Sequence, residues 1–250
     1  MIQLISINKT FNKGQATENN AINNVSLSIN SKEFVVIVGS NGSGKSTLLN
    51  CIAGSILTDS GKIIFNEQHD VTSLKDYQRT IWISRIFQNP LIGTAPGLTV
   101  LDNFRLASIR TKSKNISVGI NQNFIQKVKE SLSTLGMGLE NKIHQPVGSL
   151  SGGQRQAITL LMSVFDQSSI LLLDEPTAAL DPKSASVVME TANHLITSLQ
   201  LTAILVTHNL KEAITFGNRI IQMHHGEIIK DLKNEEKSNL NNAEIFQWFQ

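Results

Sequence analysis

The stretch FVVIVGSNGSGKST, residues 34–47, determines the architecture that the sequence predicts. Its first five residues form a continuous apolar run, as in strands that are buried on both faces of a parallel sheet. GSNGSGKS, at 39–46, matches a phosphate-binding loop, and a helix is expected directly after it. Glycines let the backbone wrap around phosphates with its N–H groups pointing inward, and the helix adds the positive end of its dipole. The stretch therefore predicts an α/β nucleotide-binding fold.

Two side chains of this loop are expected to bind the nucleotide and its metal in addition to the backbone N–H groups. Lys45 would reach the β- and γ-phosphates of a nucleotide, and the hydroxyl of Ser46 would ligate Mg²⁺. The alternative is a chance glycine turn, which the flanking strand and helix make a rare event. The expected nucleotide-binding residues of this segment are Gly39, Ser40, Asn41, Gly42, Ser43, Gly44, Lys45, Ser46 and Thr47.

Two more apolar runs, ILLLD at 170–174 and AILVT at 203–207, also lead to reactive side chains. Ligands bind at the carboxyl ends of strands in open parallel sheets, so the three runs predict one shared rim. Adjacent side chains of an extended chain point to opposite sides, so Asp174 and Glu175 should differ in role. We expect Asp174 to hold Mg²⁺ through water, Glu175 to orient or deprotonate the attacking water, and His208 to bind the γ-phosphate. The alternatives are a solvated acidic turn and a structural histidine.

The composition excludes several classes of protein. With 250 residues, 40% of them apolar, the chain suits one large domain or a domain with an inserted lobe. A net charge of +2 gives no indication of a general nucleic-acid binder. We find no secretory signal and no apolar run near the roughly 18–20 residues that cross a bilayer, so the cytosol is the simplest compartment. Cys51, the only cysteine, is expected as a small buried residue. The other histidines lack metal-ligand spacing and are expected at the surface: His69, His144, His194, His224 and His225.

The remaining patterns give a mixed order of elements. Short strands are expected at 2–7, 25–29 and 61–65, a crossover helix at 182–200, and a hairpin at 219–232. A short terminal helix with three aromatic residues should follow: Phe246, Trp248 and Phe249.

The middle of the chain, near residues 90–165, reads as an inserted helical lobe. Residues 99–109 form one expected helix, with Thr99 as its cap. Residues 123–137 form another, with apolar side chains on one face: Phe124, Val128, Leu132 and Leu135.

A second glycine-rich stretch, LSGGQRQ at 150–156, also opens an expected helix. Six motifs of the chain, in their order along it, resemble those of the ATP-binding subunits of ABC transporters. They are GSNGSGKS, Gln88 in RIFQNP, LSGGQRQ, ILLLDEP, ALDP at 179–182 and His208 in VTHN. The resemblance covers essentially the whole chain. It implies a P-loop NTPase (RecA-like) core with an N-terminal antiparallel β subdomain and an inserted α-helical subdomain. We expect the core at 1–88 and 166–250 and the helical subdomain at about 89–165.

The resemblance also accounts for the second glycine-rich stretch. In that family two subunits face each other head to tail, and the signature loop of one covers the γ-phosphate held by the other. Hydrolysis should therefore need a dimer, although SGGQ could instead serve only as a helix cap. The signature residues implied to contact the partner's ATP are Ser151, Gly152, Gly153 and Gln154.

Other roles are implied by the same resemblance. Gln88 should link the metal and the water to the helical lobe, and Asp181 should communicate between the two sites. Phe11 should stack on adenine, unless it belongs to the core. The catalytic set contains no departure from the family pattern, which predicts an active ATPase: Lys45, Asp174, Glu175 and His208.

The implied function is a motor subunit that uses ATP and Mg²⁺ at the cytoplasmic face of a membrane. Its partners would be a second ATPase subunit, separately encoded permease subunits and an extracytoplasmic solute-binding protein, with no nucleic acid. Import is favoured and export is the alternative. Segments such as LSGGQRQAITLLM resemble ATPases of bacterial importers for aromatic amino acids or related organic solutes. Soluble ABC proteins of ribosomes usually carry two cassettes, and chromosome-maintenance ATPases carry long coiled coils, so neither class fits.

Overall fold

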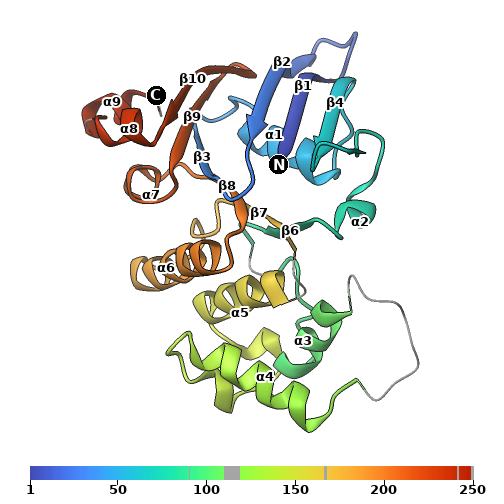
Figure 1. The fold of residues 1–250 in the computed structure, drawn as a ribbon, viewed down its shortest axis with the longest axis vertical. Helices are drawn as coiled ribbons and strands as arrows, with labels where there is room; N and C mark the ends of the chain where they lie inside the picture. The colour runs from blue at the N-terminus through green and yellow to red at the C-terminus, as the bar shows by residue number, and fades with distance from the viewer. Residues whose placement is uncertain (90, 110–118, 166–167, 241, 249–250) are drawn as a thin grey trace. The chain divides into compact units, whose positions relative to one another are not determined.

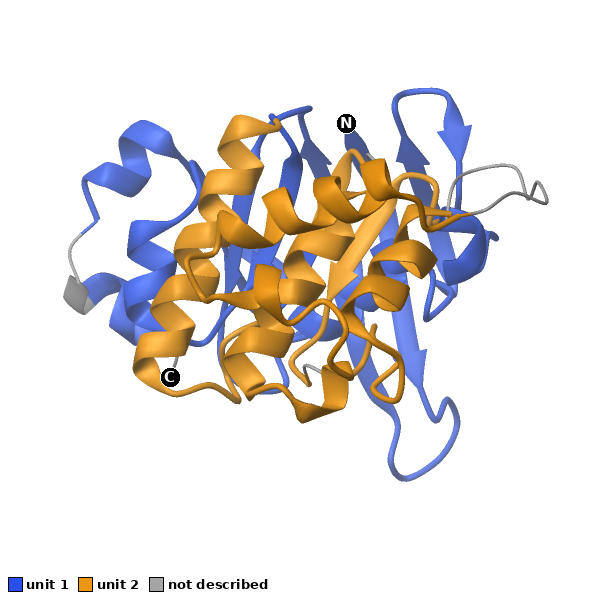
Figure 2. Ribbon diagram, turned by 90° about the horizontal axis from the view of Figure 1, so that it is seen from below, with its two compact units in different colours: residues 1–79, 172–174, 200–250 blue, residues 80–171, 175–199 orange. Residues whose placement is uncertain are grey.

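The computed structural model describes residues 1–89, 91–109, 119–165, 168–240 and 242–248. The chain forms two compact units, drawn in different colours in Figure 2. Unit 1 contains Met1–Arg79, Leu172–Asp174 and Gln200–Gln250, and unit 2 contains Thr80–Leu171 and Glu175–Leu199. Within the described ranges, no helix combines the length and the apolar character that crossing a membrane requires.

An antiparallel sheet forms the amino-terminal part of unit 1 (Figure 1). Its strand order is β2-β1-β4-β5. Paired residues such as Ile2 and Ile29 are buried, because alternate side chains of each strand face the core. The three expected strands are confirmed, and each is longer than the pattern indicated. The strands are β1 (Ile2–Phe11), β2 (Asn19–Ile29), β4 (Ser60–Phe65) and β5 (His69–Asp70).

The central strands of unit 1 are nearly all buried, as their continuous apolar runs predicted. The strand order is β10-β9-β3-β8, in which β10 is the mostly exposed edge strand, followed by β7, whose last three residues belong to this unit. β3 pairs in parallel with both β8 and β9, and the expected hairpin consists of β9 and β10. The strands are β3 (Phe34–Val38), β7 (Ile170–Asp174), β8 (Thr202–Val206), β9 (Arg219–His224) and β10 (Glu227–Lys233).

The helices of unit 1 are short. Cys51, in the first of them, is fully buried, and burial raises the pKa of its thiol to about 11, which confirms the expected apolar role. The expected terminal helix consists of two short helices, near which Trp248 is buried under Lys230. Phe246 is exposed, and Phe249 lies outside the described residues. The helices are α1 (Lys45–Ala53), α2 (Asp76–Arg79), α7 (Leu210–Thr215), α8 (Asn234–Ser238) and α9 (Asn242–Gln247).

Unit 2 is mostly helical and has its own apolar core. Its buried residues come from α3, α4, α5 and α6 and from the segments between them, with Phe104 against Phe165 near the centre. The strand β6 (Ile83–Ile86), which the sequence analysis did not predict, lies beside α5. The helices are α3 (Val100–Ser108), α4 (Gln122–Ser133), α5 (Gly152–Phe165) and α6 (Pro182–Ser198), with short 3₁₀ turns at Leu139–Asn141 and Val147–Ser149.

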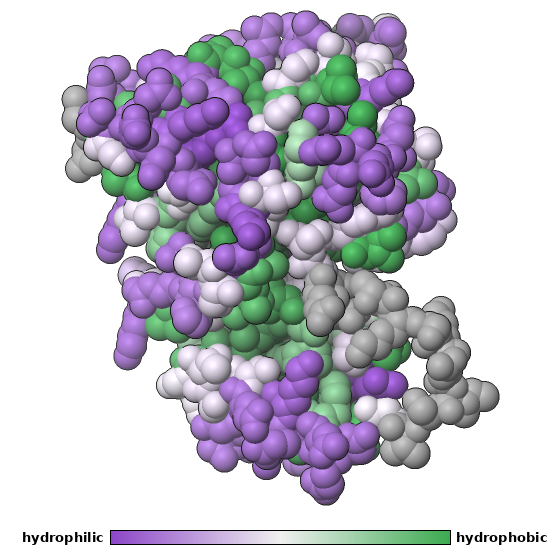
Figure 3. Space-filling model, viewed as in Figure 1, coloured by the Kyte–Doolittle hydropathy of each residue, from purple (hydrophilic) through white to green (hydrophobic). Residues whose placement is uncertain are grey.

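The two helices expected in the middle of the chain are present. Thr99 caps α3 in a reciprocal arrangement with Asp102, as its position predicted. The expectation of one helix to residue 137 was wrong, because α4 ends at Ser133 and glycines with positive φ follow at 136 and 138. Leu135 is nevertheless buried with the apolar face. Hydrophilic side chains cover most of the surface around α4 in Figure 3, as expected for an amphipathic helix.

Candidate functional site

The phosphate-binding loop joins β3 to α1 in unit 1, as predicted. Lys45, the first residue of α1, is 6% exposed, and its ammonium group lies inside the curve of the loop. Its Nζ donates hydrogen bonds to the carbonyl oxygens of Gly39 and Ser40, both at 2.8 Å. The loop therefore holds a buried positive charge by its own backbone.

Two glycines of the loop are required by close packing. A Cβ atom on Gly39 would lie 2.2 Å from the carbonyl oxygen of Met223, and one on Gly44 would lie 2.3 Å from that of Ala21. Both residues have positive φ. A hydrogen bond also joins the loop to Gly226, because the carbonyl oxygen of Ser43 accepts the N–H of Gly226 at 3.0 Å. Neighbouring strands and turns thus hold the loop in shape.

The structure brings two expected metal ligands together. The hydroxyl of Ser46 donates to Oδ1 of Asp174 over 3.2 Å, and both residues belong to unit 1. Adjacent oxygen ligands of an octahedral Mg²⁺ site lie about 3 Å apart, since each lies about 2.1 Å from the metal. A hydroxyl and a carboxylate at this separation therefore fit Mg²⁺ completed by phosphate and water oxygens. Among the described residues no cluster of three or more His, Cys, Asp or Glu forms.

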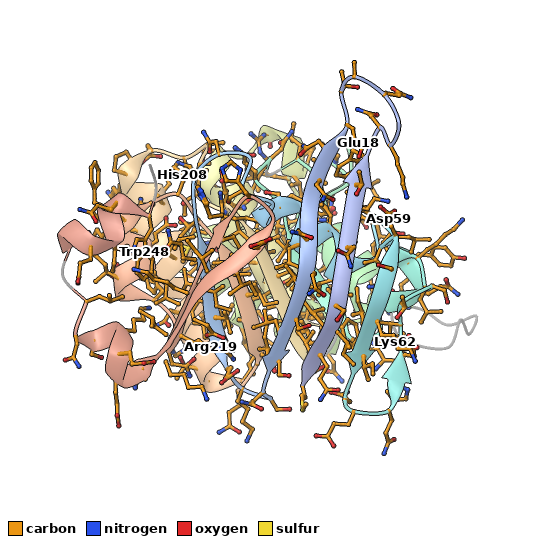
Figure 4. All side chains as sticks on the ribbon, turned by 90° about the horizontal axis from the view of Figure 1, so that it is seen from above. Glu18, Asp59, Lys62, His208, Arg219 and Trp248 are labelled. Carbon is orange, nitrogen blue, oxygen red and sulfur yellow. The ribbon has the colours of Figure 1, made fainter. Side chains whose placement is uncertain are left out.

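His208 lies at the same end of the unit 1 sheet as the loop. Ile37 pairs with Val206 in the parallel β3–β8 ladder. Gly39 lies two residues after Ile37, and His208 lies two residues after Val206, so both leave the sheet at the same end. The imidazole is exposed, and Figure 4 shows it at the opposite end of the strands from Arg219. The shared rim predicted for the loop and the histidine is confirmed within unit 1.

A buried hydrogen bond fixes the backbone on both sides of His208. Thr207, on one side, donates its hydroxyl to the carboxylate of Glu212 at 2.5 Å. The same hydroxyl accepts the N–H of Asn209, on the other side, at 3.0 Å. Sequence reasoning missed Glu212, because nothing in its local pattern separates it from a solvated helical glutamate.

Phe11 ends β1 and is only partly buried, so it is not part of the buried apolar core of unit 1. Lys9 Nζ lies 5.7 Å from the centre of its ring and also pairs with Asp59. A partly exposed aromatic ring beside a cation can stack on a planar base. The sequence alternative of a core phenylalanine is therefore not supported.

Glu175 belongs to unit 2 and adopts a left-handed backbone, with φ of 46°. β7 ends at Asp174, so Glu175 lies outside the strand. The alternation of side chains in an extended strand therefore does not apply to this pair of carboxylates. Left-handed glutamate is uncommon, and such strain collects at functional sites. The reason given from the sequence for separate roles was wrong, because Glu175 does not continue the strand, and the roles themselves stay predictions.

The signature stretch in unit 2 opens α5 with a capping box. Ser151 Oγ accepts the N–H of Gln154 and Gln154 Oε1 accepts the N–H of Ser151, both at 3.3 Å. The sequence alternative of a helix cap thus describes a real local function of SGGQ. Ser151 is exposed, so capping leaves this end of the helix accessible to a ligand.

Gly153 and Asp181 both lie against Ser184, near the start of α6. A Cβ on Gly153 would lie 2.6 Å from the Ser184 side chain, so the second signature glycine permits α5 and α6 to pack. Asp181 caps α6 by accepting the Ser184 N–H at 3.0 Å, and the hydrogen bonds from Ser184 hold the pKa of Asp181 below its usual value. The structure therefore places the loop aspartate beside the signature helix, within unit 2.

Gln88 follows β6 in unit 2, where its side chain is exposed. The expected site residues are thus divided between the units. Unit 1 holds Phe11, the phosphate loop, Asp174 and His208, and unit 2 holds Gln88, the signature residues, Glu175 and Asp181.

Comparison with known proteins identifies the family of the chain. The family model described as ABC transporter matches residues 22–178. The chain belongs to the ABC transporter family. It is an ATP-binding subunit, and ATP hydrolysis is its activity.

Individual relatives of this ABC protein cover nearly its whole length. It is 40% identical over 250 residues to a tyrosine transport ATP-binding protein of Clostridioides difficile, covering 100% of this chain and 99% of that protein. It is 32% identical to the phosphonates import ATP-binding protein PhnC of Lactococcus lactis, covering 94% of each. Among solved structures, a dimeric post-hydrolysis state of the ATP-binding cassette MJ0796 bound to ADP and Pi is similar, with a TM-score of 0.79 and 30% identity over 94% of this chain and 99% of that one.

Proposed function

We propose that the chain is the ATP-hydrolysing subunit of a bacterial importer and works at the cytoplasmic face of the membrane with separately encoded permease subunits. The observation that carries the proposal is the 40% identity, over the whole chain, to a tyrosine transport ATP-binding protein. The phosphonate relative is named for import, which favours import over the export alternative. A solute-binding protein on the outer side would deliver the solute, which by the same relative is tyrosine or a similar small organic molecule.

In the proposed mechanism, unit 1 binds the nucleotide. The loop N–H groups and Lys45 neutralise the β- and γ-phosphates, and the partly buried ring of Phe11 stacks on the adenine. Ser46 and Asp174 would hold Mg²⁺, which screens charge on the phosphate oxygens. Gln88 is proposed as a further contact to the metal and the water. Its placement in unit 2 leaves that role to be tested by mutation.

Hydrolysis in this proposal is an in-line attack by water on the γ-phosphorus. Glu175 accepts the proton of the water as the new P–O bond forms, and the bond to the ADP oxygen breaks. His208 donates a hydrogen bond to a γ-phosphate oxygen, where negative charge is concentrated. Thr207 and Glu212 hold the backbone that carries this histidine.

The proposed site is completed by a second copy. Ser151 and Gly153 of one subunit would donate to the γ-phosphate held by the loop of the other, with the positive end of α5 directed at it. The exposure of Ser151 and the similarity to a dimeric ATP-binding cassette support this arrangement. ATP then joins the two copies, and hydrolysis releases them, which moves the permease subunits.

The experiment is tyrosine uptake by cells that lack this gene and carry a plasmid copy of it. We expect the parental copy to restore uptake of labelled tyrosine and the Glu175→Gln copy to restore none, because the variant lacks the base that accepts the proton. Glu190→Gln, at an exposed glutamate of α6, is the matched control and should restore uptake fully. Unchanged tyrosine uptake in the deletion strain would remove the proposed solute, and restoration by Glu175→Gln would remove the proposed chemistry.

A further inference from the structure

The last residue of LSGGQRQ has no role in the proposed mechanism, yet it is fully buried. Gln156 lies on α5 with 0% of its surface exposed. Its Nε2 donates a hydrogen bond of 3.0 Å to the carbonyl oxygen of Phe87. Phe87 directly precedes Gln88, so the signature helix holds the backbone that carries the exposed glutamine. All of these residues belong to unit 2.

A second hydrogen bond ties the same helix to the same strand. Ser84, in β6, donates its hydroxyl to the carbonyl oxygen of Ser163, near the end of α5, at 2.5 Å. The two attachment points lie three residues apart on the strand side, or about 10 Å, at about 3.3 Å per residue. They lie seven residues apart on the helix, or about 10.5 Å at 1.5 Å per residue. The earlier residue of the strand side bonds the later residue of the helix, so α5 runs antiparallel to β6, and the matched spacing lets both bonds form together.

The amide of Gln156 is only half satisfied. Among the described residues, its Oε1 has no hydrogen-bond partner although it is buried. Leaving a buried acceptor unpaired costs about 1–3 kcal/mol, whereas an apolar side chain of the same shape would fill the position without that cost. The hydrogen bond to Phe87 therefore needs a reason other than stability.

We propose that Gln156 is a positioning residue that couples the signature loop to Gln88. α5 begins at the signature loop, and Gln156 lies one turn further along it, so a shift of the helix end moves the Phe87 carbonyl and the residue after it. A signature loop that contacts the γ-phosphate would thereby set the orientation of Gln88 at the same time. The inference rests on the proposed function, in which the signature loop contacts the nucleotide held by the partner copy and Gln88 acts at the nucleotide of its own subunit, so Gln156 would link the two nucleotide sites.

The test is a double-mutant cycle in the full chain, with ATPase kinetics measured at a protein concentration where parental activity has saturated. Gln156→Met keeps the length of the side chain and removes the donor. We expect it to lower kcat about tenfold with little change in the KM for ATP, the effect of losing one hydrogen bond that acts in the transition state. In the Gln88→Ala background it should cause no further loss, because the group that it positions is gone.

Thr159→Val is the matched control on the same helix. Thr159 is also buried, and its hydroxyl donates within α5 to the Arg155 carbonyl at 2.8 Å, with no other partner among the residues that the structure describes. This variant should keep the parental kcat, and in the Gln88→Ala background it should leave the activity of Gln88→Ala unchanged.

The outcomes separate the inference from the proposed function. A parental kcat for Gln156→Met overturns the inference, even if the melting temperature is lowered. The inference also fails if Gln156→Met lowers kcat by the same factor in the Gln88→Ala background as in the parental chain. A parental kcat for Gln88→Ala alone shows that the role proposed for Gln88 has failed, and the inference fails with it. If Gln156→Met does not fold, Gln156→Leu takes its place in the same cycle and is judged by the same results.

Discussion

At the scale of the residue, the glycines of the phosphate loop have two separate reasons for being glycine. The motif predicted that glycines let the backbone wrap around phosphates, and the structure shows positive φ at Gly42 and Gly44. The close approach of Gly44 to the Ala21 carbonyl was not predicted, because residues 23 positions apart in the sequence meet only after folding. Gly42 has nothing within 4 Å of the position of a Cβ.

This contrast gives a prediction about stability. Gly44→Ala should lower the free energy of unfolding by about 2–4 kcal/mol, because the new Cβ would lie against a backbone carbonyl that must move. Gly42→Ala, with a similar φ and open space, should lose only about 1 kcal/mol from the left-handed backbone. Urea unfolding of both variants measures the difference. Equal losses would show that the contact with Ala21 does not shape the loop.

The same distinction between local and distant information holds for the rest of the site. Local pattern was sufficient for the strand–loop–helix at residues 34–53, for the cap at Thr99 and for the burial of Cys51. It could not give the left-handed backbone of Glu175 or the burial of Gln156, which depend on segments far away in the sequence. The catalytic roles themselves stay predictions until variants are measured.

At the scale of the element, buried cations hold the ends of two helices whose starts lie at the proposed site. Arg79 donates to the carbonyl oxygens of Cys51 and Ile52, both at 2.8 Å, at the end of α1. Lys237 donates to the carbonyl oxygens of Phe216 and Gly217, just past the end of α7. Cations are favourable at helix carboxyl ends because the last carbonyl groups lack partners within the helix. The sequence patterns predicted neither of these contacts, because each cation lies many residues away along the chain from the helix whose carboxyl end it contacts.

Lys237 makes stability depend on pH in a stated direction. Burial lowers the pKa of its ammonium from 10.5 to about 8. Between these values the unfolded chain binds more protons than the folded one, so this group makes the free energy of unfolding rise with pH from about 8 to 10.5. Lys237→Met should flatten the rise, and Lys211→Met, at an exposed lysine of α7, should keep it. Urea unfolding across this window measures the slope, and the same slope in Lys237→Met and the parental chain would contradict the prediction.

The strands show which part of the fold can be derived from one sequence. Continuous apolar runs identified β3, β7 and β8, because strands buried on both faces leave no polar positions. β6 escaped prediction, since its sequence ISRI mixes polar and apolar residues and its Ser84 is buried only through its hydrogen bonds to Ser163 and Ser168. Such a position becomes recognisable only once its partners are known.

At the scale of the whole molecule, each compact unit carries only part of the proposed site. The phosphate loop, Asp174 and His208 belong to unit 1, whereas Gln88, Glu175 and the signature residues belong to unit 2. The helical subdomain was expected at about 89–165, while unit 2 also includes α6, whose Val188 joins the apolar cluster around α5. Where the inserted subdomain begins and ends thus stays a prediction.

The most direct measurement of the shared site is the specific ATPase activity of the purified chain as its concentration is raised. We predict that activity per subunit rises with concentration and then saturates, and that Ser151→Arg abolishes it while leaving nucleotide binding at the phosphate loop intact. Asn121→Arg, which removes the N-cap of α4, controls for the loss of a helix cap and should behave as the parental chain. Constant activity per subunit at every concentration, together with parental turnover by Ser151→Arg, would contradict a site completed by a second copy.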